Sequence, residues 1–316
     1  MIPARNPPLS LDPAFQVPAW TTRRVAVESD AEAAFVAGGA LLALDRIMRA
    51  DYPWAGVWRQ RQALKCAVVA VRLSGRREDD AQLRDAWVLR RPGDDAGPSG
   101  TMYGAWKRLA ARPLFLEVET LREVTVSLDL RWTDELEALP RGCEALQRQT
   151  SSPPLAIAQI VSRIMALGAP YELLAWWAAD QMLKEMMGWP VALPLMMAQR
   201  QSAYFRTERS QKRLSPETDG FTRAVTLSLA DAAIDAVRFA GDIDRRAQRL
   251  LEVVPKLRAK GASDAVDLLL SEDAVSGSLV TRKLSRFASR RLFDRLLDFE
   301  AIRELSGRQN SRVFGL

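Results

Sequence analysis

The sequence predicts an all-α protein: a multi-helix body followed by a C-terminal winged helix-turn-helix with one small β-hairpin. Apolar residues recur at helical spacing through most of the 316 residues. No series of alternating strands interrupts that spacing in the body. Strand-like residues gather only near the end, around a glycine-containing turn at residues 307–310.

Helix N-caps and clusters of turn-forming residues predict the limits of the N-terminal segment and of the body helices. Residues 1–28 are rich in proline and without periodicity, so we expect an extended N-terminal arm. Ser29 and Asp30 form a helix N-cap signature, with Glu32 in the first turn. Turn formers crowd residues 91–100 and 150–154. Helical patterns occupy most of the remainder to residue 220, namely 54–73, a short helix ending at 89, 102–112, 117–128, 133–149, 155–167, 171–187 and 193–213. We therefore expect a helical domain over 29–220.

A long amphipathic stretch follows the body. Ile234, Val237 and Ala247 recur on one face, with charged residues such as Arg238 opposite them. Pro255 is expected to kink or end the helix. Residues 221–261 are thus predicted to be a connector helix, and a helix of this kind often contributes to a homodimer.

Residues 262–316 show the order of a winged helix-turn-helix. Three helices are predicted at 264–270, 276–284 and about 286–299, followed by a hairpin whose strand residues are Ile302, Leu305, Val313 and Phe314. On the third helix the i, i+3, i+4, i+7 rule turns Leu292, Phe293, Leu296 and Phe299 inward.

Positive charge concentrates in this segment. The chain has 45 Lys and Arg against 39 Asp and Glu, a net +6. From residue 282 to residue 312 there are nine basic and four acidic residues, which supply +5 of that total. We expect Arg286, Arg290 and Arg291 to approach the major groove of double-stranded DNA, with Arg295 beside them. Backbone or base contacts are expected from Lys283 and from the hairpin residues Arg308, Gln309, Asn310 and Arg312.

A second interpretation stays open at this point. Winged helices also dock proteins, and Asp294 and Asp298 lie on the presumed reading face, where they would repel phosphate. An adaptor or structural subunit is therefore the alternative to a DNA-binding protein. High salt would separate the two, because protein docking should survive conditions that release DNA.

Several reaction classes are excluded by composition. The chain has no histidine, so it has no Ser-His-Asp triad, no Cys-His pair and no His-ligated zinc. Its two cysteines, Cys66 and Cys143, are too few for a disulfide framework. Acidic residues near 78–80 and 94–95 fit no Ca²⁺ loop, and Asp79 stands where a helix cap belongs. We expect no catalytic residue, metal or cofactor.

The sequence shows no signal peptide and no membrane-spanning stretch, which favours the cytoplasm. The first residues lack a continuous apolar core after their arginine, unlike a signal peptide. The longest apolar stretch, residues 33–44, is too short to span a bilayer. The expectation is a cytoplasmic protein without a membrane partner.

Two resemblances add to this interpretation. Residues 222–316 resemble the C-terminal tail of Fic-like proteins through the run Ile302-Arg-Glu-Leu-Ser-Gly-Arg308 and through Arg312-Val-Phe. Nucleotide transfer by Fic enzymes needs a histidine-containing loop, which this chain cannot have, so the resemblance implies no such catalysis.

The second resemblance covers nearly the whole chain. The segments at residues 34–45, 56–61, 83–87, 91–98 and 179–182 are similar to an uncharacterised alphaproteobacterial family, domain of unknown function 1403. That family is frequent on plasmids, so the resemblance implies a bacterial host and a mobile-element setting. It implies no activity. Combined with the basic C-terminal segment, it leads us to expect a transcriptional regulator or plasmid-maintenance factor without catalysis.

Overall fold

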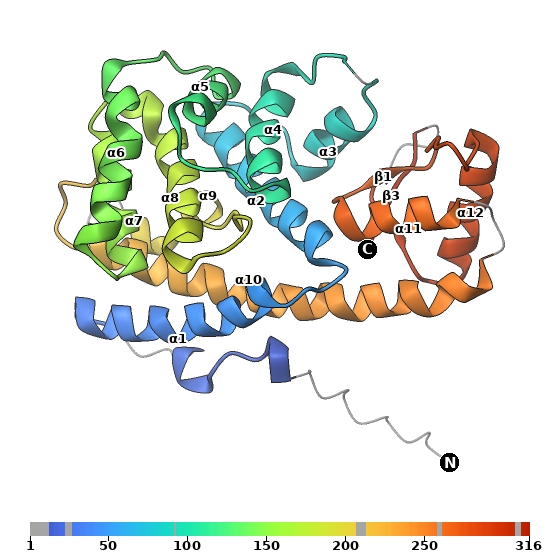
Figure 1. Cartoon of the computed structure of the whole chain (residues 1–316), viewed down its shortest axis with the longest axis horizontal. Coiled ribbons are helices and arrows are strands. Elements are labelled where there is room, and N and C mark those ends of the chain that lie inside the picture. Colours follow the sequence, from blue (N-terminus) through green and yellow to red (C-terminus); the bar gives the residue numbers. More distant parts are fainter. Residues whose placement is uncertain (1–12, 23–26, 92, 207–212, 258–260, 307–310) are drawn as a thin grey trace.

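The computed structural model describes residues 13–22, 27–91, 93–206, 213–257, 261–306 and 311–316. A helical body and a smaller C-terminal module, residues 262–316, lie side by side above one long helix, α10 (Figure 1). The structure confirms the predicted fold class, since helices dominate and the described strands form one small sheet at the C-terminal end.

The first long helix, α1 (Asp30–Arg49), begins where the cap signature predicts. The Glu32 N–H donates to Ser29 Oγ, and the Glu32 carboxylate accepts from the Ser29 N–H, which completes a capping box. Helix α1 then packs along α10 (Figure 1).

Part of the predicted N-terminal arm is folded. Residues 13–22 contain two short 3₁₀ helices, η1 (Pro13–Phe15) and η2 (Ala19–Thr22). Phe15 is buried with its ring against Tyr52 and Trp54. This stretch therefore packs on the body, because one aromatic side chain finds an apolar site there. Residues 1–12 of the predicted arm lie outside the described residues.

The body contains the helical segments that the breaks predict, with one exception. Its helices are α2 (Ala55–Leu73), α3 (Asp80–Val88), α4 (Gly97–Ala111), α5 (Val118–Ser127), α6 (Asp134–Gln149), α7 (Pro153–Met165), η3 (Ala169–Tyr171), α8 (Glu172–Met187), α9 (Met196–Gln199) and η4 (Ala203–Phe205). Helix α2 packs on α4, and α7 packs on α8. Trp176 and Trp177 of α8 are fully buried, so they belong to the core.

The exception is the helix expected over 193–213. Only α9 and η4 form within the described part of that range. The N–H groups of Leu195 and Met196 donate to the buried carboxyl of Asp180 instead of to a preceding turn. Side chains from Leu193 to Met197 fill the space against α8 and α2, so tertiary packing overrides the local helical pattern.

The connector is a single helix, α10 (Phe221–Val253), followed by the short η5 (Val254–Lys256) that contains Pro255. Its 33 residues span roughly 50 Å at about 1.5 Å per residue. Its apolar face, which includes Ile234 and Val237, is buried against α1, α7 and neighbouring elements of the same chain. Most of that face is therefore covered within the chain, although Leu251 is 40% exposed, and the expected homodimer stays a prediction.

The C-terminal module contains α11 (Ala262–Ser271), β1 (Val275–Ser276), α12 (Arg286–Asp298), β2 (Arg303–Glu304) and β3 (Val313–Gly315). The strands form an antiparallel sheet in the order β1-β3-β2. Val275 and Glu304 both pair with Phe314, from opposite sides of β3. The predicted first helix, third helix and hairpin are thus present.

The predicted second helix, 276–284, is wrong. Residues 275–276 form β1, and the N–H of Gly277 donates to the carbonyl of Arg312, so the backbone is committed to the sheet. The ring of Phe314 lies so close to Gly277 that a Cβ there would be 2.7 Å away. The module therefore lacks the predicted second helix of a helix-turn-helix among its described residues. The predicted third helix, α12, and the paired strands β2 and β3 are present.

None of the helices in the described ranges combines the length and apolar character needed to cross a bilayer.

Candidate nucleic-acid interface

Helix α12 is held by its apolar face. Leu292, Phe293 and Leu296 are buried, and the Phe293 ring stacks on Phe314 of β3 with 4.9 Å between centroids. The hydroxyl of Ser289 is also buried and donates to the carbonyl of Gly277. Phe299, expected to point inward as well, is 38% exposed because α12 ends at Asp298 and the chain turns away. The inward face is therefore as predicted, except at its last position.

The start of α12 is capped by Ser285, whose Oγ accepts a hydrogen bond from the Ala288 N–H at 3.3 Å. This cap fixes the helix N-terminus beside Lys283, and the backbone of Lys283 lies against Gly261 at the start of α11. Gly261 has a φ of +86°, and a Cβ there would lie 2.9 Å from the Lys283 backbone. Close packing of these two backbones thus fixes the start of α12 against the start of α11.

Exposed cations surround this helix. Residues 282–295 contain six basic side chains, and all are exposed, namely Arg282, Lys283, Arg286, Arg290, Arg291 and Arg295. Among the described residues none of the six forms an ion pair. The structure therefore brings together the five predicted site residues in this stretch, and adds Arg282 to them.

Some of these cations are positioned by aromatic rings. The guanidinium of Arg291 lies 4.4 Å from the ring centroid of Phe287, and that of Arg295 lies 5.5 Å from the ring of Phe299. Such contacts orient an arginine without neutralising its charge. Both guanidinium groups keep their donors for another partner.

Arg312 differs from the other predicted contacts. Its guanidinium donates to Asp294 at 2.8 Å and to Glu304 at 2.9 Å. Burial acts to lower the pKa of Arg312, but the hydrogen bonds to Glu304 and Asp294 outweigh it and raise the pKa. Arg312 is therefore not a free cation. Its pairing has a second effect, since it offsets the charge of Asp294, the one carboxylate within residues 282–295.

The other hairpin residues expected at the interface are Arg308, Gln309 and Asn310. They lie outside the described residues.

The module is fastened to the body by a buried group of charges that the sequence did not indicate. Asp273, just after α11, is 2% exposed and accepts hydrogen bonds from Arg61 of α2 and from Arg84 of α3, the latter at 2.7 Å. The neighbouring Glu272 pairs with Lys107 of α4 at 2.7 Å. These contacts join residues 165 to 212 positions apart in sequence, so no local pattern could have revealed them.

This environment also perturbs a neighbouring phenol. Burial raises the pKa of Tyr103 well above its ordinary value, and the charge of Asp273 adds to the effect. The phenol therefore stays neutral next to the ion pairs. The group fixes the attachment of the module, and its Asp273, Arg61 and Arg84 side chains are buried.

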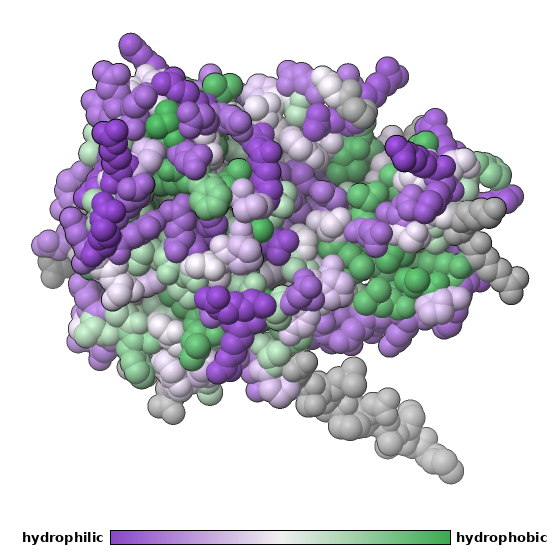
Figure 2. Space-filling view, in the orientation of Figure 1, coloured by the Kyte–Doolittle hydropathy of each residue, from purple (hydrophilic) through white to green (hydrophobic). Residues whose placement is uncertain are grey.

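Exposed apolar side chains lie close to the basic ones. Val280 and Phe287 are each 65% exposed. Figure 2 shows hydrophobic residues gathered over the C-terminal module, between α11 and α10. A shallow hollow of about 320 Å³ beside α12 is lined by Leu257, Ser285, Phe287, Ala288, Arg291, Leu292 and Arg295. The module thus presents apolar surface as well as charge.

The acidic residues considered as metal ligands have local structural roles. Asp79 caps α3 by accepting from the Gln82 N–H, as its position predicted. Asp95 accepts from the Gly97 N–H at the start of α4. Within the described ranges, no three His, Cys, Asp or Glu side chains gather closely enough to hold a metal ion. Both cysteines are buried, and burial raises the pKa of the Cys66 and Cys143 thiols.

Comparison with known proteins identifies the chain at the level of its family. No curated protein is similar enough to count as a match. One family model covers residues 10–316, which is the body, the long helix and the C-terminal module together. The chain therefore belongs to the family described as "Protein of unknown function (DUF1403)".

Proposed function

We propose that the chain binds double-stranded DNA through the C-terminal module, with α12 as the main contact element. The observation that carries the proposal is the group of six exposed cations within residues 282–295, a range whose single acidic residue, Asp294, is paired with Arg312. A surface with unpaired arginines and lysines attracts phosphate and releases counterions from a duplex. No cofactor or catalytic step is part of the proposal.

The position of α12 supports the same function. Helix α12 stands at the end of the molecule farthest from α6 and α7 (Figure 1). The C-terminal module that contains α12 is joined to the body through the buried ion pairs of Asp273. The exposed side chains of α12 therefore have a defined position relative to the body. A rigid element at one end of a molecule can approach a groove without interference from the body. A role in transcriptional control or in upkeep of a mobile element follows as the broader part of the proposal.

Salt dependence is the direct test. Binding of a fluorescent duplex of about 20 base pairs would be followed by anisotropy at several salt concentrations, with a slope of log K against log salt of roughly −5 for six neutralised phosphates. Arg286→Gln and Arg290→Gln should each reduce the magnitude of the slope by about 1. Arg148→Gln is the matched control, because Arg148 is an exposed arginine on α6 in the body. The proposal fails if no duplex is bound at low salt, or if Arg148→Gln weakens binding as much as the α12 variants do.

A protein-docking role is the second candidate, and the exposed Val280 and Phe287 favour it. A hydrophobic contact would be insensitive to salt and sensitive to Phe287→Ala. Retention of a host protein at high salt by the natural chain, lost in Phe287→Ala and kept in Arg290→Gln, would favour docking over DNA binding.

A further inference from the structure

A hollow in the body lies far from α12 and belongs to no site discussed so far. It has a volume of about 580 Å³. Its walls come from the end of α2, the start of α4, the end of α5 and the start of α8. That volume is within the range of small-molecule sites, roughly 300–1,000 Å³. The cavity can therefore accept a small organic molecule.

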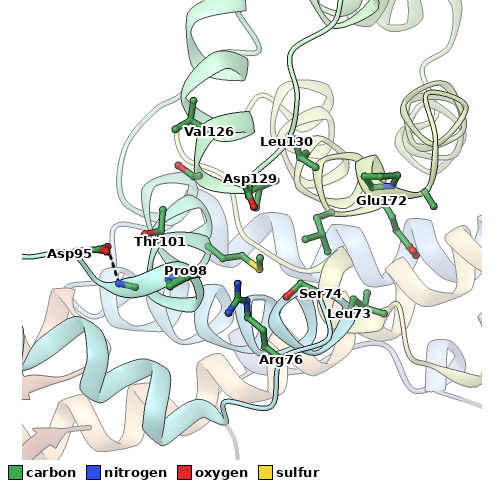
Figure 3. Close-up of a pocket in the computed structure, with 17 residues that line it drawn as sticks. Leu73, Ser74, Arg76, Asp95, Pro98, Thr101, Val126, Asp129, Leu130 and Glu172 are labelled. Atoms are coloured by element: carbon green, nitrogen blue, oxygen red, sulfur yellow. Dashed lines mark hydrogen bonds between the residues drawn. The ribbon is translucent and has the colours of Figure 1, made fainter.

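The cavity has an apolar interior with charged groups around it. Met102, Leu128 and Leu173 are among the apolar residues that line it and are buried. In Figure 3 the Arg76 side chain enters from one side, and Asp129 lies on the opposite side. These two residues supply opposite charges to one space.

Two further carboxylates line the cavity, but both already have partners. Asp95 accepts a hydrogen bond from the Gly97 N–H at 2.9 Å. Glu172 forms an ion pair with Arg200, which is buried. Among the described residues, neither carboxylate forms an ion pair with Arg76.

Arg76 and Asp129 are different in this respect. Both side chains are exposed and line the cavity, and among the described residues neither forms an ion pair. They do not pair with each other, so their charged atoms are more than 4.0 Å apart. Asp129 also has a φ of +56°, a left-handed conformation that is uncommon for a residue other than glycine. Two opposite charges without an ion pair among the described residues thus line one cavity.

We propose that this cavity binds a small zwitterion with an apolar body, that is, an α-amino acid or a short peptide. Its carboxylate would accept hydrogen bonds from the Arg76 guanidinium, for which a planar bidentate pairing is favourable. Its ammonium would donate to Asp129, and its apolar side chain would cover Met102 and Leu173. An anion alone would leave Asp129 unpaired, and a cation alone would leave Arg76 unpaired, so the pair of charges selects a ligand that carries both.

Calorimetric titration of the full chain tests this with four probes: leucine, the dipeptide leucyl-leucine, N-acetyl-leucine without an ammonium group, and leucinamide without a carboxylate. We expect saturable binding of at least one zwitterion. The matching one-charge probes should bind about tenfold or more weakly, the loss that follows when a charge-assisted hydrogen bond is removed.

Two conservative variants assign the two ends. Arg76→Gln should weaken zwitterion binding about tenfold or more while leaving the weak binding of leucinamide unchanged. Asp129→Asn should do the same for the zwitterion and leave N-acetyl-leucine unchanged. Asparagine tolerates the left-handed conformation, so this variant keeps the turn. Arg77→Gln is the control, because Arg77 is an exposed neighbour that does not line the cavity.

The inference is overturned if no zwitterion binds the natural chain at about 10 mM, which is about ten times a dissociation constant of about 1 mM. It is also overturned if a one-charge probe binds as tightly as the zwitterions, or if Arg76→Gln and Asp129→Asn leave affinity unchanged. These outcomes are independent of DNA binding, because the cavity and α12 share no residue.

Discussion

Replacing Asp273 with asparagine removes the one negative charge that Arg61 and Arg84 share in the interface between the body and the C-terminal module. The Asp273 side chain is 2% exposed, and those of Arg61 and Arg84 are 11% and 6% exposed. Asparagine has nearly the same shape, so packing is kept while the charge is lost. The Arg61 guanidinium is then left without a carboxylate, and that of Arg84 keeps only Asp80, which is 3.5 Å away and whose side chain is 65% exposed.

The expected loss follows from that burial. Removing one partner of a buried ion pair lowers the free energy of unfolding by about 3–5 kcal/mol, because the remaining charge is uncompensated. For 316 residues the entropy of unfolding scales to about 0.7 kcal/mol/K, so the melting temperature should fall by roughly 5–8 °C. Thermal unfolding followed by far-ultraviolet circular dichroism measures this change.

Asp298→Asn provides the control. Asp298 is an exposed aspartate at the end of α12, and its replacement should change the free energy of unfolding by no more than about 0.5 kcal/mol. If Asp273→Asn unfolds within about 1 kcal/mol of the natural chain, a value below the range for breaking a buried pair, the interface is not held by these charges.

Three further predictions concern the body and its helices. Gly56→Ala should lower the free energy of unfolding by about 1–3 kcal/mol, because a Cβ at Gly56 would lie 2.6 Å from the Ser271 Cα of α11. Gly38→Ala in α1 has open space and should raise it by about 1 kcal/mol; equal urea midpoints for the two variants would contradict this packing. Burial raises the pKa of Asp180 from its ordinary 3.8 to about 8, so the folded chain holds a proton that the unfolded chain releases. Stability should then fall as pH rises through that window, and Asp180→Asn should gain stability relative to the natural chain between about pH 5 and about pH 9, as urea midpoints at both pH values would report. An unchanged difference between the two proteins would refute that assignment. Burial likewise raises the pKa of Cys143 to about 12 and that of Cys66 well above its usual range; both thiols should resist a disulfide reagent in the folded chain and react once urea unfolds it, and rapid labelling without urea would show that the thiols are accessible.

Local patterns predicted the features that depend on neighbours within a few turns. Ser29 caps α1, Asp79 caps α3, and the long amphipathic stretch forms α10. The inward face of α12 also follows the periodicity, so the exposure of Arg286, Arg290 and Arg291 could be foreseen. Helical spacing and capping are properties of contiguous residues, which is why the sequence alone was sufficient for them.

Other features of the C-terminal module depend on residues distant in sequence. Residues 275–276 became a strand because Val313 and Phe314 pair with them across the sheet. Arg312 forms ion pairs with Asp294 and Glu304, so it is not available as an unpaired cation. The helix expected over 193–213 does not form as predicted, because the Leu195 N–H donates to Asp180. None of these partners lies within one helical turn of the residue that it changes.

The sequence by itself determined a helical chain with a basic C-terminal segment, because helix caps, periodicity and local charge depend on residues that are close together in the chain. The tertiary structure alone decided that Asp273 would meet Arg61 and Arg84, and that Arg76 and Asp129 would face one cavity. The physical reason is that burial and charge pairing depend on distances in space, which folding sets between residues that have no local relation.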